Sequence, residues 1–326
     1  MYKSYSRKDL VMGKIAFVFP GQGAQIPFMG KDFYENYDVC RKIFHEAEKG
    51  LGIDFKNLIF SEDIRLNDTR YTQPAMVLVS IMMIEAIKRH GIVPDITCGL
   101  SLGEYSALNA SGYLDFMDIM KLIKLRGDLM SSCGEKHKGY MAALIGLKDE
   151  KLQELIEEGK KHGIISVANY NCPGQIVVAG EEEAVQWAVD NIRTYKGIKG
   201  IRLNVSGAFH SILMEEASTG FNKEFHNLSM KDSLIPMALN FDGTISNDKE
   251  YIRNALVEGI KSPVHFQQCV EAMKKFGVTT FIEIGPGKTL TSFIKKIDRG
   301  LNTFNIDSVK ALEELIGNLK DTKEEL

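Results

Sequence analysis

Short apolar runs alternate with helical periodicities along the first third of the chain. Residues 15–19 form a compact β-branched and aromatic run that ends in a tight-loop sequence at residues 20–23, and residues 96–100 form a second apolar run. Such runs are typical of buried strands. Helical patterns are expected near residues 36–49 and 74–89, from Leu102 onward, and over residues 115–130. Strands that alternate with helices predict an α/β fold with a parallel, doubly wound sheet.

The predicted order of strands and helices changes in the middle of the chain. The pattern predicts a strand at residues 140–147, a helix at 149–160, strands at 164–168 and 175–179 joined by a turn at 171–174, a helix at 181–195 and a strand at 201–205. The order βαββαβ is the ferredoxin-like unit. We therefore expect a ferredoxin-like subdomain at residues 136–206, inserted into a large α/β catalytic domain that comprises residues 13–135 and 207–319.

The large-domain pattern returns after the insertion. Residues 235–241 and 279–284 are expected to be strands, each beside a helix. Residues 285–288 predict a structural turn that opens another helix, because they lack the GxxxxGK[ST] spacing of a phosphate loop. We expect residues 1–12 to be a loose extension and residues 320–326 to be a charged tail that frays.

Composition narrows the classes of function. The chain has 326 residues, of which 44% are hydrophobic and 25% are charged, as is ordinary for a soluble globular protein. The formal net charge of -3 argues against nucleic-acid binding, which normally requires a basic excess. None of the five cysteines forms a CxxC pair, so the sequence indicates neither a zinc site nor a redox motif and suits a reducing cytoplasm.

No segment has the pattern of a membrane span or an export signal. The most apolar stretch, residues 75–87, contains Ser80 and Glu85 and is shorter than the roughly 20 residues that a bilayer requires. The chain starts with polar and charged residues, and the apolar run at 15–19 is too short for a signal-peptide core. We expect a cytoplasmic protein without a membrane partner.

A GxSxG pentapeptide at residues 99–103 is the clearest candidate for chemistry. An apolar strand precedes it and a helix follows it, as a nucleophile elbow requires. Glycines two residues to either side of Ser101 remove side chains that would collide at the sharp turn, and the following helix directs backbone N–H groups at the site. Ser101 is the expected nucleophile. The alternative is a strand-to-helix turn that carries an inert serine.

A nucleophilic serine needs a base, and two of the seven histidines are candidates. His210 lies in a loop of small residues, 206–211, after a strand and before a helix, where catalytic groups are usually carried. His265, in the segment 263–266, is its competitor. We favour His210 as the base, and the residues alone leave His265 open.

The loop at residues 20–25 is a candidate for an oxyanion hole. Its glycines allow backbone N–H groups to approach a ligand closely. Two donors are needed, and we expect them to be the N–H groups of Leu102, the residue after the nucleophile, and Gln22. A dinucleotide-binding loop is the rival interpretation, but Ile26 stands where its pattern requires the third glycine.

Six motifs then occur in the order found in one family. They are FPGQGAQ at 19–25, GLSLGEYSAL at 99–108, RG at 126–127, NCPGQ at 171–175, GAFHS at 207–211 and EIGPG at 283–287. Together they resemble the bacterial malonyl-CoA:acyl-carrier-protein transacylases of the acyltransferase domain family. The resemblance implies a hydrolase-like α/β domain with an inserted ferredoxin-like subdomain. It also implies transfer of the malonyl group from malonyl-CoA to acyl carrier protein in fatty acid biosynthesis, with a coenzyme A thioester as substrate and no bound cofactor or metal.

The resemblance also implies roles for individual residues. Ser101 matches the family nucleophile and His210 its general base, while the N–H groups of Gln22 and Leu102 match the oxyanion donors. Arg126 matches the arginine that binds the malonyl carboxylate. Most helix arginines are simply solvated, but a free carboxylate calls for a planar, two-pronged cation, which favours arginine over lysine.

The sequence departs from the family pattern at two positions. Leu100 stands before the nucleophile, where the family usually has histidine, and Gly259 stands where the family often has glutamine. The family uses the backbone carbonyl at the second position to orient the catalytic histidine. Since glycine retains that carbonyl, the resemblance still implies a Ser–His dyad oriented by Gly259.

Three other functions remain open from the sequence. A serine hydrolase shares the GxSxG motif, but it should carry an HGGG-type oxyanion loop, which this chain lacks. A free-standing acyltransferase of a polyketide synthase is barely distinguishable by sequence. A carrier-protein docking module with a dead site is the non-catalytic alternative, and the presence of Ser101, His210 and Arg126 argues against it.

Overall fold

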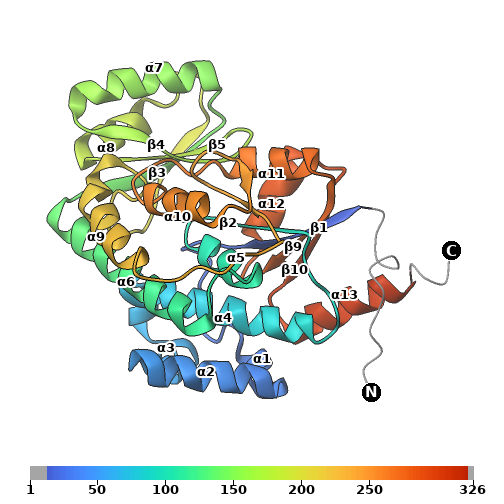
Figure 1. Cartoon of the computed structure of the whole chain (residues 1–326). Helices are drawn as coiled ribbons and strands as arrows, with labels where there is room; N and C mark the ends of the chain where they lie inside the picture. The colour runs from blue at the N-terminus through green and yellow to red at the C-terminus, as the bar shows by residue number, and fades with distance from the viewer. Residues whose placement is uncertain (1–12, 322–326) are drawn as a thin grey trace.

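A six-stranded, mostly parallel sheet organises the larger part of the chain (Figure 1). The computed structural model describes residues 13–321, with strand order β10-β9-β1-β2-β7-β8 in this sheet. All neighbours are parallel except β7 and β8. The strands are β1 (Lys14–Phe19), β2 (Ile96–Gly99), β7 (Met237–Ala238), β8 (Ile245–Ser246), β9 (Val278–Ile284) and β10 (Asn302–Ile306).

Strand β1 separates two cores because its successive side chains point to opposite faces of the sheet. Phe17 packs in the core that contains α4, whereas Val18 packs in the core that contains α11 and α12. Both side chains are fully buried, as expected for a parallel strand covered on both faces. The helices of this part are α1 (Lys31–Asn36), α2 (Asp38–Leu51), α3 (Phe55–Ile59), α4 (Thr69–Lys88), α5 (Gly103–Ala110), α6 (Phe116–Lys136), α9 (Glu215–Phe225), α10 (Lys249–Glu258), α11 (Phe266–Lys275), α12 (Thr289–Ile297) and α13 (Val309–Asp321).

A second, four-stranded sheet is built from the middle of the chain. Its strands are β3 (Tyr140–Ile145), β4 (Ile165–Cys172), β5 (Gln175–Gly180) and β6 (Lys199–Arg202), in the antiparallel order β4-β5-β3-β6. Helices α7 (Asp149–Gly159) and α8 (Glu182–Asn191) share a hydrophobic core with it. The connectivity is βαββαβ, so the predicted fold class, an α/β sheet with a ferredoxin-like unit, is confirmed.

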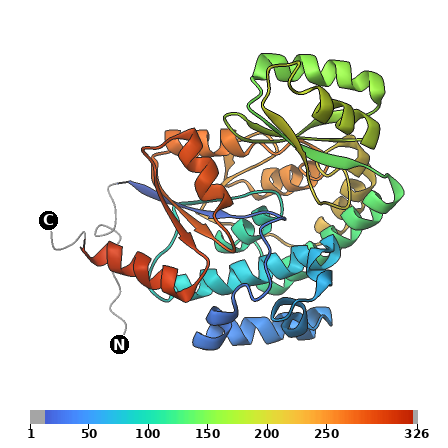
Figure 2. The ribbon, with the colours of Figure 1, turned by 180° about the vertical axis from the view of Figure 1, so that it is seen from behind.

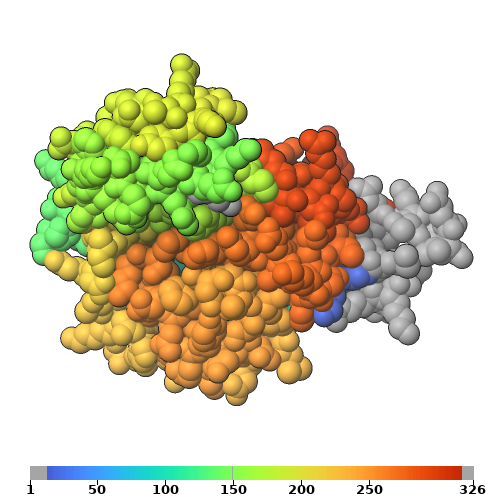
Figure 3. Space-filling view, turned by 90° about the horizontal axis from the view of Figure 1, so that it is seen from above, coloured from blue at the N-terminus to red at the C-terminus, as the bar shows by residue number. Residues whose placement is uncertain are grey.

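The two sheets lie next to each other, and an isolated bridge joins Asn169 of β4 to Val264, just before α11 (Figure 1). Short 3₁₀ turns occur at Ile64–Asn67, Lys160–His162 and Ile212–Met214. From above, the part that carries α7 and α8 (green to yellow) adjoins the segments that carry α10 to α12 (orange; Figure 3). Helix α13 lies on the side away from α7 in both ribbon views (Figures 1 and 2).

The domain limits at residues 136 and 206 stay a prediction. The expected extension, residues 1–12, and residues 322–326 of the expected tail lie outside the described residues.

Several elements differ in extent from the sequence prediction. Helix α4 begins at Thr69 rather than near residue 74, because the Asp68 carboxylate accepts the Arg70 N–H and caps the helix. The strand expected at 235–241 is only Met237–Ala238, since the next residues turn back and the Leu239 N–H donates to the Thr244 carbonyl. No helix among residues 13–321 is long and apolar enough to cross a membrane.

The turn between β2 and α5 depends on close backbone contact. A Cβ atom at Gly103 would lie 2.2 Å from the Phe19 carbonyl oxygen, and one at Gly99 would lie 1.9 Å from the Gly103 carbonyl carbon. Backbone atoms of a buried sheet cannot move aside as a flexible side chain can. The glycines of the pentapeptide therefore allow α5 to start directly against the ends of β1 and β2.

Replacement of Gly103 by alanine should destabilise the fold. We expect the added methyl group to lower the free energy of unfolding by about 1–3 kcal/mol, the usual cost of overpacking. Gly317→Ala is the matched control, because a Cβ atom there has no neighbour within 4 Å and the residue lies inside α13. The control should raise stability by up to about 1 kcal/mol through helix propensity. Urea denaturation of both variants measures the difference, and equal stabilities would contradict the packing argument.

Candidate active site

The carboxyl ends of β1 and β2 bring two loops together, at the edge of a parallel sheet where ligands usually bind. Ser101 lies in the turn after β2 with φ 53, a left-handed conformation that is uncommon for a residue with a Cβ atom. Its N–H donates to the Asn240 side-chain oxygen at 2.7 Å. Such a conformation persists only where surrounding contacts fix it, and it occurs preferentially at functional sites.

The structure places His210 directly against this serine. The Ser101 Oγ and His210 Nε2 atoms are 2.7 Å apart, and the His210 Nδ1 atom is 2.7 Å from the Gly259 carbonyl oxygen. A carbonyl oxygen can only accept, so Nδ1 carries the hydrogen and Nε2 presents its lone pair to the serine hydroxyl. The Gly259 carbonyl thus contacts the histidine ring, and its orienting role stays a prediction.

Burial also lowers the pKa of His210. His210 is 5% exposed, and burial, together with the positive charge of Arg126, lowers its pKa from 6.5 to about 4. The hydrogen bond to Gly259 opposes this shift. His210 is neutral at neutral pH and can accept a proton.

His265, the competing candidate, lies elsewhere. Its ring stacks on Tyr170 with centroids 5.2 Å apart, and its Nδ1 atom is 3.1 Å from the Asn240 carbonyl oxygen. Position therefore favours His210 over His265, and the role of His210 as the base stays a prediction.

Arg126 extends from α6 into the same site and is 3% exposed. It donates from Nη1 to the Gln73 side-chain oxygen at 2.8 Å and from Nη2 to Ser101 Oγ at 2.9 Å, while its buried Nε–H has no partner. Among the ion pairs of residues 13–321, none involves this arginine. The alternative of a solvated helix arginine is wrong.

A buried cation without a charged partner is costly unless an anion can approach it. Glu104, the carboxyl group that interacts electrostatically with Arg126, is mostly protonated at neutral pH, because burial raises its pKa to about 8. The guanidinium group consequently offers a site for an anion next to Ser101 Oγ.

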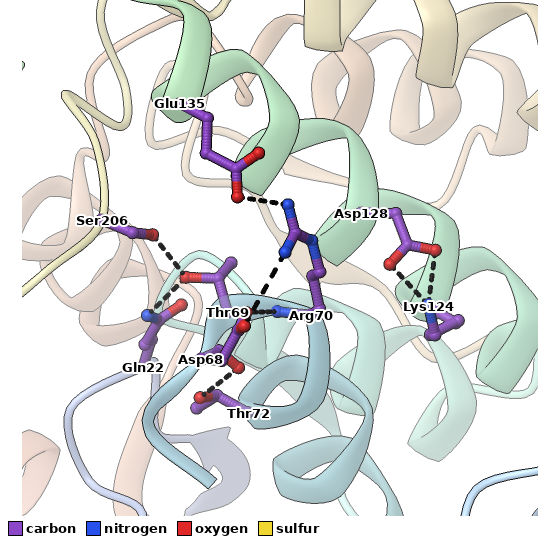
Figure 4. A network of polar contacts seen from close by, with 9 residues as sticks. All are labelled: Gln22, Asp68, Thr69, Arg70, Thr72, Lys124, Asp128, Glu135 and Ser206. Carbon is purple, nitrogen blue, oxygen red and sulfur yellow. Dashed lines mark hydrogen bonds and ion pairs between the residues drawn. The ribbon is translucent and has the colours of Figure 1, made fainter. Parts of the chain in front are cut away.

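The two expected oxyanion donors border the nucleophile. Gln22 and Leu102 both line the site cavity, and Leu102 is the N-cap residue of α5, where backbone N–H groups lack intrahelical acceptors. The Gln22 side chain donates to Thr69 Oγ1 at 3.0 Å, and that oxygen is 3.0 Å from Ser206 Oγ (Figure 4). The contact holds the glycine-rich loop against the start of α4.

A cavity of about 200 Å³ connects these groups. Its walls come from both sheets, with Met141, Ala143 and Val177 on the second sheet and Phe293 on α12. The second sheet also contributes three polar side chains to the wall, Asn169, Asn171 and Gln175. Ser101, His210 and Arg126 gather on the side of the first sheet. Across residues 13–321, no cluster of three or more histidine, cysteine or acidic side chains could hold a metal ion.

Sequence reasoning missed three polar residues of the site. Gln73 binds Arg126, Asn240 binds the Ser101 N–H, and the Glu104 carboxyl accepts the Asn240 N–H at 2.8 Å. All three are at most 5% exposed. Asn240 directly follows the apolar run 237–239, which was an available signal because buried polar groups need partners.

Comparison with known proteins identifies the family of the chain. The acyl transferase domain family matches residues 16–325. The malonyl CoA-acyl carrier protein transacylase of Bacillus subtilis (strain 168) is 38% identical over 312 residues, covering 95% of this chain and 98% of that protein. The enzyme of the same name from Staphylococcus aureus (strain MRSA252) is 37% identical over 308 residues, covering 94% of this chain and 98% of that protein.

Solved structures of proteins with the same kind of name share the fold of this chain. The crystal structure of malonyl CoA-acyl carrier protein transacylase from Clostridium perfringens superimposes with a TM-score of 0.91 at 37% identity, covering 95% of this chain and 98% of that chain. A malonyl-transacylase in complex with its type II polyketide synthase acyl-carrier protein has a TM-score of 0.90 at 34% identity, with coverage of 94% and 99%. The chain belongs to the acyl transferase domain family, in the group of the malonyl CoA-acyl carrier protein transacylases.

Proposed function

We propose that this acyltransferase moves the malonyl group from malonyl-CoA to the phosphopantetheine thiol of acyl carrier protein, in fatty acid biosynthesis, through a malonyl ester on Ser101. The observation that carries the proposal is the position of Arg126. Its Nη2 atom lies 2.9 Å from Ser101 Oγ, in a buried site where its two hydrogen-bond partners, Gln73 and Ser101, are uncharged. Malonyl-CoA carries a free carboxylate one methylene group away from its reactive carbonyl, so one cation beside the nucleophile can bind it.

The first half-reaction forms the ester. His210 Nε2 takes the proton of Ser101 Oγ as this oxygen attacks the thioester carbonyl, and the N–H groups of Gln22 and Leu102 bind the resulting oxyanion. Collapse of the tetrahedral intermediate breaks the carbon–sulfur bond, and the coenzyme A thiolate takes the proton from His210. The Gly259 carbonyl stabilises the transiently charged imidazolium through the Nδ1–H bond.

The second half-reaction transfers the malonyl group to the carrier. His210 accepts the proton of the phosphopantetheine thiol, the sulfur attacks the ester carbonyl, and Ser101 Oγ leaves and regains the proton. Such a sequence gives ping-pong kinetics. Residues of the protein supply all of the acid–base chemistry, and coenzyme A enters as a substrate, with no bound cofactor proposed.

Two enzyme alternatives differ in the acceptor of the malonyl group. A hydrolase would release free malonate, whereas a charge-held malonyl carboxylate on Arg126 keeps the ester oriented for a thiol. Service to a polyketide synthase is the second candidate, because one structural relative is a malonyl-transacylase bound to a type II polyketide synthase carrier. We favour fatty acid synthesis and propose that the protein works in the cytoplasm, where its five free cysteines are expected to remain reduced.

Removal of the nucleophile should abolish transfer. We expect Ser101→Ala to lower the rate by about 10⁴–10⁶-fold while the protein remains folded, as is usual when a nucleophile is lost. Transfer of radiolabelled malonyl groups to holo acyl carrier protein measures the rate, and circular dichroism checks the fold. Activity within tenfold of the unmodified enzyme would refute the role of Ser101.

Arg126 should determine the preference for malonyl over acetyl groups. A buried, charge-assisted hydrogen bond contributes about 1.5–3 kcal/mol, so Arg126→Ala should lower malonyl transfer roughly 10–150-fold and spare acetyl transfer. Arg126→Lys should recover only part of the activity, since an ammonium group cannot make the planar two-bond contact. Assays at pH 8 keep His210 neutral in every variant.

The exposed Arg70 provides the matched control for this experiment. It pairs with Glu135 outside the cavity (Figure 4), so Arg70→Ala should leave the malonyl-to-acetyl ratio unchanged. If Arg126→Ala instead reduces malonyl and acetyl transfer by the same factor, Arg126 is structural and the carboxylate is bound elsewhere.

The pH dependence of acylation should reflect the lowered pKa of His210. The base must be neutral, so single-turnover acylation should stay constant from pH 8 to pH 6 and decline only as the pH approaches about 4. Arg126→Gln removes one cause of the shift and should move this decline toward the ordinary value of 6.5. Quenched-flow mass measurement gives the rates. A decline centred near 6.5 in the unmodified enzyme would contradict the assignment.

The same shift predicts the direction of acid destabilisation. Unfolded chains bind the His210 proton below about pH 6.5, whereas the folded protein binds it only near pH 4. This contribution to stability is therefore complete at neutral pH and decreases as the pH falls between these values. Acylation rates at low pH must be corrected for the folded fraction.

A further inference from the structure

Asn240 lies just beyond β7, and its side chain bridges the two sides of the turn that carries Ser101. The side-chain oxygen accepts the Ser101 N–H at 2.7 Å, and the side-chain nitrogen donates to the Gly99 carbonyl at 2.8 Å. Asn240 is 1% exposed, so water does not compete for these bonds. One amide thus holds the residue before and the residue after Leu100.

The bridged turn contains one of the two left-handed residues of the site, the other being His210 with φ 58. Ser101 has φ 53, a conformation that residues with a Cβ atom rarely adopt unless neighbouring groups fix it. In this conformation Ser101 Oγ lies 2.7 Å from His210 Nε2 and 2.9 Å from Arg126 Nη2. A return of the Ser101 backbone to a common conformation would turn Oγ away from both partners.

The backbone of Asn240 is itself held from two directions. Its N–H donates to the Glu104 carboxyl at 2.8 Å, and its carbonyl accepts the His265 N–H at 2.8 Å. Glu104 belongs to the first turn of α5, and His265 precedes α11. The amide is therefore anchored by the two helices that flank it, and it acts as a fixed support.

Asn240 does not line the cavity that contains Ser101, His210 and Arg126. It can affect the reaction only through the residues that it holds. We propose that Asn240 is a positioning residue that fixes Ser101 in the left-handed conformation in which Oγ faces His210. The proposal deepens the proposed function and rests on Ser101 being the nucleophile.

An amide is the side chain that this position requires. Leucine has a similar size but can neither accept from the Ser101 N–H nor donate to the Gly99 carbonyl. Aspartate can still accept from Ser101, but its second oxygen would face the Gly99 carbonyl oxygen, where no donor remains. Asn240→Leu removes both bonds, and Asn240→Asp removes one and adds a repulsion.

The test measures acylation of Ser101 by malonyl-CoA in a single turnover, together with the Michaelis constant and the malonyl-to-acetyl ratio. We expect Asn240→Leu to lower the rate at saturating malonyl-CoA by about 10²-fold, the cost of a small misplacement of a reacting group. The Michaelis constant and the acyl preference should stay unchanged, because Arg126 and the cavity wall of the second sheet lie outside the turn that Asn240 holds. Labelling of Ser101 by a fluorophosphonate should slow by a similar factor.

Asn109→Leu is the matched control. Asn109 lies in α5, the helix that follows the turn, and its side-chain oxygen has no partner among the described residues. This variant should acylate at the normal rate. Thermal denaturation of all variants shows whether a lower acylation rate reflects a loss of folded protein. If Asn240→Leu does not fold, the acylation rate of Asn240→Asp tests the proposal.

Two outcomes would overturn the proposal. One is a folded Asn240→Leu or Asn240→Asp variant that acylates within threefold of the unmodified enzyme. The other is a loss that resides in the Michaelis constant or in the acyl preference, which would place Asn240 in substrate binding. Failure of the proposed function is distinguishable, since it would appear as activity in Ser101→Ala.

Discussion

The left-handed turn at Ser101 is the constraint on which the rest of the site depends. It can form only because α5 starts within van der Waals contact of the ends of β1 and β2, where a Cβ atom at Gly103 would lie 2.2 Å from the Phe19 carbonyl oxygen. That close approach puts the first N–H groups of α5 next to the loop after β1. It also projects Ser101 Oγ above the sheet, where groups from distant segments can meet it.

Those groups arrive from separate parts of the fold, and each is held by burial. His210 comes from the connection after the second sheet, with its ring oriented by the Gly259 carbonyl. Arg126 comes from α6 and is fixed by Gln73. The low dielectric of the enclosed site strengthens the interaction of Arg126 with an anion, and the same burial keeps His210 neutral. A single environment thus suits both the proposed base and the proposed anion site.

The sequence predicts the part of this site that is local along the chain. The five consecutive residues of the GxSxG pentapeptide predict the turn at Ser101. The hydrophobic periodicity of the middle of the chain predicts the βαββαβ order of the second sheet. The partners of these residues depend on tertiary contacts and are not visible locally. His210 and His265 both lie in loops, and only the folded chain shows which of them reaches Ser101. Gly259 acts through its backbone carbonyl, so its side chain carries no signal for that contact.

The central claim is that the chain forms a malonyl ester on Ser101. The most direct measurement is peptide mapping by mass spectrometry after the enzyme is incubated with malonyl-CoA and quenched in acid. The account predicts one added malonyl mass on the peptide that contains Ser101, lost when holo acyl carrier protein is added before the quench. A malonyl group on another residue, or a label that the carrier thiol cannot remove, would contradict it.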